Sequence, residues 1–320
     1  MFKKLFNNQL SPEDTLLLKK RTMHGVINFI RYFFLLALSY VVLFQLLYMI
    51  SYALRPEADM YNPSVVWIPS EITWKNFTLA FTALNYLESG LVSLWLGQVS
   101  AFIEVFVCAV IAYGFARFEF KEKNVIFFMV LVTIMIPVQM LVVPTYLNYS
   151  HFDVLGILNQ FRLWTGVDLR PNLVDTAWTF YLPSIFGVGV RSGLFIFIYR
   201  KFFESLPREL EEAAYVDGAG PMRTFISVIL PSSGVVFLTV TIFSVIWHWN
   251  ECYMAGMYMV DNKPLAVMLD TFSSAAKNVG GDSRNARMAA CLMFITPVLI
   301  LYMFLQRKFV QSIDRVGIVG

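Results

Sequence analysis

Residues 32–54, YFFLLALSYVVLFQLLYMISYAL, form an uncharged run between Arg31 and Arg55. A helix needs about 20 apolar residues to cross the roughly 30 Å hydrocarbon core of a bilayer. The run is too long for the apolar core of a signal peptide, and no small-residue cleavage site follows it. We therefore expect residues 32–54 to remain in the mature chain as a transmembrane helix.

The composition of the whole chain agrees with this expectation. Of its 320 residues, 58% are hydrophobic and 15% are charged, whereas soluble domains have about 45–50% apolar and about 25% charged residues. The net charge of +3 is too small for the basic surface of a nucleic-acid binder. The three cysteines lie in or beside apolar runs and indicate no disulfide framework. The composition predicts an all-α polytopic membrane protein.

Five further apolar runs have the length of a membrane span. They cover about residues 90–116, 124–148, 177–199, 232–249 and 288–306. Pro137 and Pro144 lie inside the third of the six spans and predict kinks there, because proline interrupts helical hydrogen bonding. The sequence thus predicts a transmembrane domain of six helices over residues 32–306, with both termini on one side of the membrane.

The loop charges predict which side that is. Of the 25 Lys and Arg residues, 16 fall on the side of the termini, in residues 1–31, 117–123, 200–223 and 307–320. Positively charged loops are retained in the cytoplasm. We therefore expect a cytoplasmic N-terminal segment, residues 1–31, and a cytoplasmic tail, residues 307–320. Within the first segment, Ser11-Pro12-Glu13-Asp14 predicts the start of a short interfacial helix.

The predicted cytoplasmic loop between spans four and five, residues 204–231, has the sequence ESLPRELEEAAYVDGAGPMRTFISVILP. Pro207 suits the first turn of a helix, Gly218 and Gly220 suit its end, and Pro221 suits the start of a second helix. The pattern predicts two short helices joined by a turn. The small side chains of Ala213 and Ala214 would let a partner's backbone come close.

This loop resembles a motif of a known family. The spacing of Glu212-Ala213-Ala214, Gly218 and Leu230-Pro231 is similar to the EAA loop of permease subunits of binding-protein-dependent ABC importers, with Val228 where the family usually has Ile. Other stretches resemble the carbohydrate branch, the class of the maltose permease G protein. These stretches are residues 68–77, 112–117, 136–146, 249–251 and 305–310. The stretch 159–175 looks longer than the family norm, and the tail 311–320 departs from the usual ending.

The resemblance implies a type I ABC importer permease fold in a bacterial cytoplasmic membrane. A second permease would complete a heterodimeric pore, two ATPase subunits would bind ATP and Mg, and an extracellular solute-binding protein would deliver an oligosaccharide or other carbohydrate. This chain would then be no enzyme and would hold no cofactor. The resemblance assigns ATPase coupling to Glu212, Ala213, Ala214, Asp217, Gly218, Leu230 and Pro231.

Glu104 and Arg191 lie inside predicted spans, where a charge facing lipid costs several kcal/mol. Three interpretations are open: the two residues pair with each other, one of them faces the translocation path, or Arg191 lies in a wet outer vestibule. Trp249, Asn250 and Glu251 interrupt the fifth span. They either line the path, as broken helices do in transporters, or form a packing kink.

Two other classes of protein compete with the importer permease. An ion-coupled secondary transporter would explain Glu104 and Arg191 but not the EAA spacing, and no inverted repeat is visible. A membrane enzyme is not indicated, because no catalytic or phosphate-binding motif occurs. A metal site is not indicated either, because His24, His151 and His248 are isolated in the sequence.

The tryptophans of the outer loops suit either the aromatic belt of the membrane surface or contact with a partner or sugar.

Overall fold

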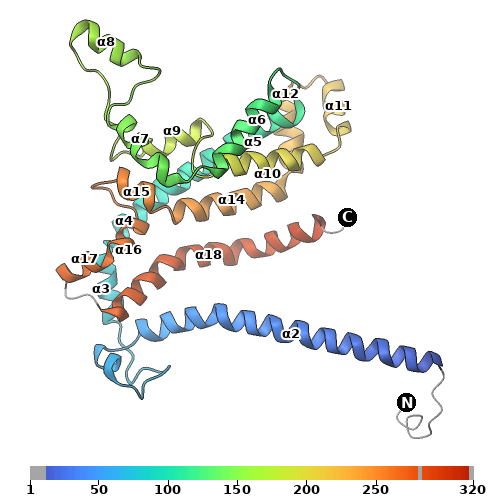
Figure 1. Cartoon of the computed structure of the whole chain (residues 1–320), viewed down its shortest axis with the longest axis vertical. Helices are drawn as coiled ribbons and strands as arrows, with labels where there is room; N and C mark the ends of the chain where they lie inside the picture. Colours follow the sequence, from blue (N-terminus) through green and yellow to red (C-terminus); the bar gives the residue numbers. More distant parts are fainter. Residues whose placement is uncertain (1–11, 280–282, 317–320) are drawn as a thin grey trace.

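The computed structural model of the protein describes residues 12–279 and 283–316, and its regular elements there are all helical (Figure 1). The predicted cap residue Ser11 and the last four residues of the predicted tail lie outside the described residues. The helices are α2 (Pro12–Ala53), α3 (Lys75–Ala83), α4 (Tyr86–Ser93), α5 (Val99–Arg117), α6 (Lys123–Met135), α7 (Val138–Ser150), α8 (Ile157–Thr165), α9 (Trp178–Ile185), α10 (Ser192–Ser205), α11 (Glu209–Val216), α12 (Pro221–Thr224), α13 (Leu230–Ser232), α14 (Gly234–Trp249), α15 (Tyr253–Tyr258), α16 (Leu265–Asp270), α17 (Phe272–Val279) and α18 (Arg284–Val316).

Three helical stretches are long and apolar enough to cross a membrane: Lys20–Ala53, Tyr86–Arg117 and Arg284–Gln306. Two bent pairs raise the number to as many as five among the described residues. In one pair α6 and α7 meet at 102°, and in the other Pro221–Ser232 and α14 meet at 83°. The first bend falls at Ile136–Pro137 and confirms the kink predicted there, since proline disfavours helix in the residue before it.

The fourth predicted span is not one helix. Instead, α9 and α10 are separated by residues 186–191, and neither helix alone is long enough to cross. Gly187 (φ 67°) and Arg191 (φ 65°) adopt the left-handed conformation in this break, which ends one helix and redirects the chain into the next. The expectation of a continuous span over residues 177–199 is therefore wrong.

The first span differs from its prediction at the N-terminal end. The predicted short interfacial helix is not separate, because α2 runs unbroken for 42 residues. No proline follows Pro12 until Pro56, so nothing in the sequence interrupts the backbone hydrogen bonds. At 1.5 Å per residue α2 is about 63 Å long, which is well beyond the roughly 30 Å of a hydrocarbon core.

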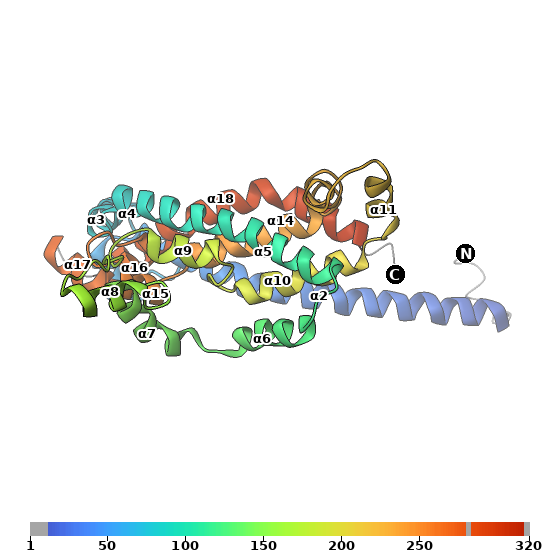
Figure 2. The same ribbon diagram turned by 90° about the horizontal axis from the view of Figure 1, so that it is seen from above.

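Helix α5 lies at the centre of the main apolar core, with α10, α14 and α9 against it (Figures 1 and 2). Its inner face carries small residues, Cys108, Ala109 and Ala112, which let neighbouring helices approach closely. A second core joins α3, α17, the end of α2 and the start of α18. Helix α11 lies at the end of the molecule opposite α3 and α17, near the described end of α18 (Figure 1).

Candidate coupling loop and intramembrane polar site

The loop over residues 204–231 forms a short helix, a turn and a second short helix, as its sequence predicts. Helix α11 ends at Val216, and α12 begins at Pro221. The Gly218 amide donates to the Tyr215 carbonyl (3.0 Å) and the Ala219 amide to that of Ala214 (2.9 Å), which closes the helix end. Gly218 has φ 78°, and a Cβ added there would meet nothing within 4 Å. Glycine is therefore favoured here by backbone conformation and not by space.

Most of the residues that the resemblance assigns to coupling are exposed. Glu212, Ala213, Asp217 and Gly218 are accessible on α11 and its turn, and Ala214 is partly buried. Leu230 and Pro231 lie farther along the segment in α13, before the 83° bend into α14. The structure thus brings the residues of 212–218 together on one exposed end and places Leu230 and Pro231 where the segment turns into the next span.

A buried ion pair fastens α11 to the end of α5. Arg117 Nε lies 2.7 Å from Glu211 Oε1, and the two side chains are only 6% and 8% exposed. Arg117 Nη2 also donates to the Leu206 carbonyl (2.9 Å) at the start of the loop. The ring of Phe225, after α12, packs 5.0 Å from that of Tyr113 of α5. The loop is therefore docked on α5 at both of its helices.

Nothing in the sequence distinguishes Glu211 from the acids beside it. Its neighbours Glu209 and Glu212 are exposed, so only one of three nearby acids on α11 faces inward. The available signal was Arg117 at the end of an apolar span, since a cation there needs an acceptor once the chain folds.

Glu104, on α5, is completely buried. Ser192, the first residue of α10, donates its hydroxyl to Oε1. Ser244 of α14 donates to Oε2 (3.1 Å), and His248 Nδ1 lies 3.8 Å from the same oxygen. A Cβ added at Gly189 would come within 2.8 Å of Oε1. The carboxylate thus joins the three central helices through hydroxyl groups and an imidazole.

Arg191 does not pair with Glu104. No ion pair joins the two among the residues that the structure describes, and Arg191 is exposed with its guanidinium 5.8 Å from the centroid of the Trp247 ring. Arg191 precedes the first turn of α10 in a left-handed conformation, and it is the neighbouring Ser192 that reaches Glu104. The pairing hypothesis is therefore wrong. Arg191 also lines a cavity of about 240 Å³ together with Thr133. A place in the translocation path or in an outer vestibule stays a prediction.

The polar break after α14 is built from specific contacts. Trp249 is buried, and its indole N–H donates to the Phe294 carbonyl of α18 (3.2 Å). Asn250 donates its side-chain amide to the Ile246 carbonyl (2.8 Å), and Glu251 Oε1 accepts from the Met254 amide at the start of α15 (2.8 Å). These contacts end one helix and begin the next, which favours the packing interpretation. A role of these residues in the translocation path stays a prediction.

Metal ligation has no support in the described part of the chain, where no group of three His, Cys, Asp or Glu side chains is placed to hold an ion.

Long apolar helices, broken spans and an exposed helical loop define an all-helical membrane protein with a docking segment. Residues 105–315 match the family model described as "Binding-protein-dependent transport system inner membrane component". This match covers more than half of the chain, so the protein belongs to that family.

The curated relatives include two bacterial sugar permeases. The chain is 28% identical to the diacetylchitobiose uptake system permease protein NgcG of Streptomyces coelicolor, over 87% of this chain and 84% of the relative. It is 25% identical to the arabinooligosaccharides transport system permease protein AraQ of Halalkalibacterium halodurans, over 88% and 93%. The resemblance to carbohydrate-type ABC importer permeases is thereby confirmed.

A solved structure shares the fold. It is a crystal structure of a bacterial ABC transporter involved in the import of the acidic polysaccharide alginate. The TM-score is 0.67 at 20% identity, covering 94% of this chain and 99% of the other. The likeness extends over nearly the whole of both chains.

Proposed function

We propose that this chain is a transmembrane permease subunit of an ATP-driven, binding-protein-dependent importer of an oligosaccharide or other carbohydrate. It forms half of the translocation pore, with a second permease forming the other half. Two ATPase subunits bind ATP and Mg, and an extracellular solute-binding protein delivers the cargo. The named cargoes of the two relatives, diacetylchitobiose and arabinooligosaccharides, support a carbohydrate.

The proposal includes a topology. Residues 32–306 cross a bacterial cytoplasmic membrane six times, with α9 and α10 together forming a broken fourth span. Residues 1–31 and 307–320 and the loop 204–231 are cytoplasmic. The distribution of Lys and Arg supports this orientation. The position of α11 at the same end of the molecule as the described end of α18 also supports it (Figure 1).

The observation that carries the coupling proposal is the anchored yet exposed α11. An ATPase subunit binds the accessible face of residues 212–218 and displaces it, and the buried Arg117–Glu211 pair transmits this displacement to α5. Helix α5 then moves α10 and α14 because the hydroxyls of Ser192 and Ser244 on those helices donate to Glu104. Packed helices linked in this way move as units when access to a pore alternates between the two sides. Membership of a binding-protein-dependent family leaves the ion-coupled secondary transporter without support.

The test is gentle extraction of the tagged chain from its native host, with identification of the co-purifying proteins and an ATPase assay. The parent should recover a second permease and an ATPase. A Glu212→Lys, Gly218→Pro variant should lose the ATPase and keep the second permease. Glu119→Lys is the matched control, because Glu119 is an exposed acid on the same predicted side but outside the loop. A parent that purifies alone, hydrolyses no ATP and still moves solute in liposomes would refute the proposal.

A further inference from the structure

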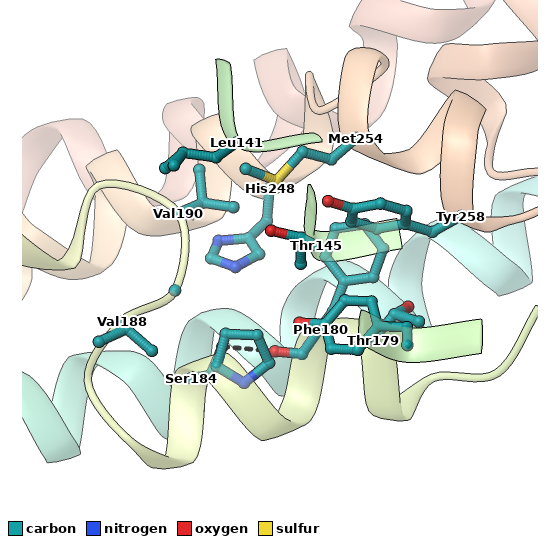
Figure 3. A pocket seen from close by; sticks show the side chains of 13 residues that line it. Leu141, Thr145, Thr179, Phe180, Ser184, Val188, Val190, His248, Met254 and Tyr258 are labelled. Carbon is teal, nitrogen blue, oxygen red and sulfur yellow. Dashed lines mark hydrogen bonds between the residues drawn. The ribbon is translucent and has the colours of Figure 1, made fainter. Parts of the chain in front are cut away.

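A cavity of about 190 Å³ lies beside the Glu104 cluster, between α7, α9, α15 and the end of α14 (Figure 3). A water molecule occupies about 30 Å³ of liquid, so the cavity has the volume of roughly six waters. It is smaller than the roughly 300–1,000 Å³ of sites for drug-sized ligands. Its size therefore suits one sugar ring and not a whole oligosaccharide.

One wall of the cavity carries an unpaired nitrogen. His248 is only 7% exposed, and its ring projects among the side chains of Thr145, Ser184 and Val190 (Figure 3). Its Nε2 is buried without a hydrogen-bond partner. Buried polar atoms in native proteins are nearly always paired. His248 Nε2 is thus a polar atom at the cavity wall with no protein group bonded to it.

The other ring nitrogen determines what that partner must be. His248 Nδ1 lies 2.9 Å from the Ser244 carbonyl oxygen, which can only accept a hydrogen bond, so Nδ1 carries the proton. In the neutral imidazole Nε2 is then an acceptor. Glu104, held by Ser192 and Ser244, lies 3.8 Å from Nδ1 and is not among the residues that line the cavity. Nε2 can therefore accept a hydrogen bond from an O–H or N–H donor.

The remaining lining separates polar from apolar groups. Thr145 and Ser184 offer hydroxyls, whereas Phe180, Val190 and Tyr258 offer apolar and aromatic surface. A sugar ring has the same division between its hydroxyls and its C–H faces. The described lining residues include no Lys or Arg, so an anionic sugar would find no positive partner in the lining of this cavity, and Arg191 belongs to the adjacent one.

We propose that this cavity is a subsite for one neutral sugar ring, and that His248 Nε2 accepts a hydrogen bond from a hydroxyl of that ring. The inference rests on the proposed function and deepens it, because it places a substrate contact in this chain and not solely in its partner permease.

The test uses the transporter complex as extracted from the host, placed in lipid nanodiscs, with ligand-observed NMR titrations. The probes are methyl glucopyranoside and methyl N-acetylglucosaminide, together with methyl glucuronide and methoxycyclohexane. The last two share the ring size but add a negative charge or lack hydroxyls. At least one neutral glycoside should bind about ten-fold more tightly than either comparison compound. Absence of neutral glycoside binding, or equal binding of methoxycyclohexane, would overturn the proposal.

Variants assign the contact to His248. His248→Phe keeps an aromatic ring but removes Nε2, and it should weaken glycoside binding about ten-fold, as expected for loss of a buried hydrogen bond. His248→Gln retains an acceptor and should have an intermediate affinity. His24→Phe, the same change on exposed α2, should bind like the parent. If His248→Phe fails to fold, Thr145→Val takes its place with a several-fold loss expected.

Unchanged affinity in a folded His248→Phe variant would refute the assignment. ATP hydrolysis measured on the same samples separates the two proposals. If no ATPase co-purifies with the parent, the proposed function fails. If the ATPase is present and active but no neutral glycoside binds, only the subsite fails.

Discussion

Two buried carboxylates lie on or against α5, and each is stabilised by different chemistry. Glu211 of α11 faces the end of α5 and is compensated by the full charge of Arg117 at 2.7 Å. Glu104, within α5, is held by two serine hydroxyls, and the one nearby group in the described structure that can become cationic is His248 at 3.8 Å. The coupling end therefore depends on a charge pair, and the intramembrane end depends on polar groups from two other helices, Ser192 of α10 and Ser244 and His248 of α14.

The difference indicates that the Arg117–Glu211 pair attaches α11 rigidly, whereas the contacts of Glu104 align α10 and α14 with α5. A buried ion pair loses most of its stabilisation when one partner is removed, because the other charge is left unpaired. Hydrogen bonds from hydroxyls are individually weaker, so α10 and α14 can change partners at Glu104 more easily than α11 can leave Arg117.

The largest effect is expected from Arg117→Ala. The change leaves Glu211 buried without its cation, and removal of one partner of a buried pair costs about 3–5 kcal/mol. The midpoint temperature of thermal unfolding of the purified complex should fall strongly. ATP hydrolysis should continue while solute uptake is lost. The double variant Arg117→Met, Glu211→Leu should regain most of the stability. Arg170→Ala, which breaks the loop ion pair with Asp168, should change little. An Arg117→Ala protein as stable as the parent would show that the pair is not the anchor.

A smaller effect is expected from Gly189→Ala, which probes the Glu104 site by steric crowding. The new methyl group would lie 2.8 Å from Glu104 Oε1 and 3.1 Å from Ser184 Oγ. Overpacking of this kind costs about 1–3 kcal/mol, measurable as a lower unfolding midpoint in detergent. Gly114→Ala on α5 is the control, because its methyl group would meet nothing within 4 Å, and alanine stabilises helices relative to glycine. Equal midpoints for the two variants would contradict the close packing around Glu104.

A third change, Gly218→Ala, tests the turn of the coupling loop without touching the ion pair. Alanine at φ 78° costs about 1–2 kcal/mol. The amides of α11 should exchange with deuterium faster, while those of α5 should not change. Gly220→Ala serves as the control because Gly220 has φ −79° and open space. If α11 exchanges equally in both variants, the left-handed turn does not stabilise the loop.

The smallest effect concerns Asp59, which reproduces the serine–carboxylate chemistry of Glu104 in a loop outside the predicted spans. The Ser70 hydroxyl (2.6 Å) and amide (2.8 Å) donate to it and hold the pKa of Asp59 below its ordinary value. Because the folded pKa is lowered, the stabilisation is complete above the unfolded value near 4 and is lost as pH falls through the folded pKa. Proteolysis of residues 57–72 should accelerate only below about pH 4. Asp59→Asn should remove this pH dependence, and its persistence in that variant would assign it to another group.

The sequence was informative wherever a local signal determines backbone conformation. Pro137 marks the bend between α6 and α7, Gly218 marks the turn after α11, and the polar residues after Trp249 mark the end of α14. Each of these positions depends on hydrogen bonding or dihedral angles within a few residues. Such features can be predicted from short sequence motifs without knowledge of tertiary packing.

The sequence was less informative where rotation about a helix decides the contact. Hydropathy treats residues 177–199 as one span, although Gly187 and Arg191 break it. Charge complementarity made Arg191 one of the open possibilities as a partner of Glu104, but the left-handed conformation before α10 makes Ser192 the residue that meets α5. The motif assigns Glu212 to coupling, which stays a prediction, and it carries no signal that the neighbouring Glu211 faces inward. A shift of one residue on a helix changes the side-chain direction by about 100°, and only tertiary contacts fix it.

The contact between α2 and α18 can form only after nearly the whole chain has been synthesised. The most apolar window of α2 is not buried within this chain; α2 meets α18 near the C-terminal end of α2, and the two helices diverge from there (Figure 1). About 230 residues separate the end of α2 from the start of α18. At about 5–20 residues per second the ribosome needs roughly 10–50 s to make them. For that time the end of α2 lacks its contact with α18, and α3, which reaches it through Asn76 and the Ala53 carbonyl, is its neighbour from this chain.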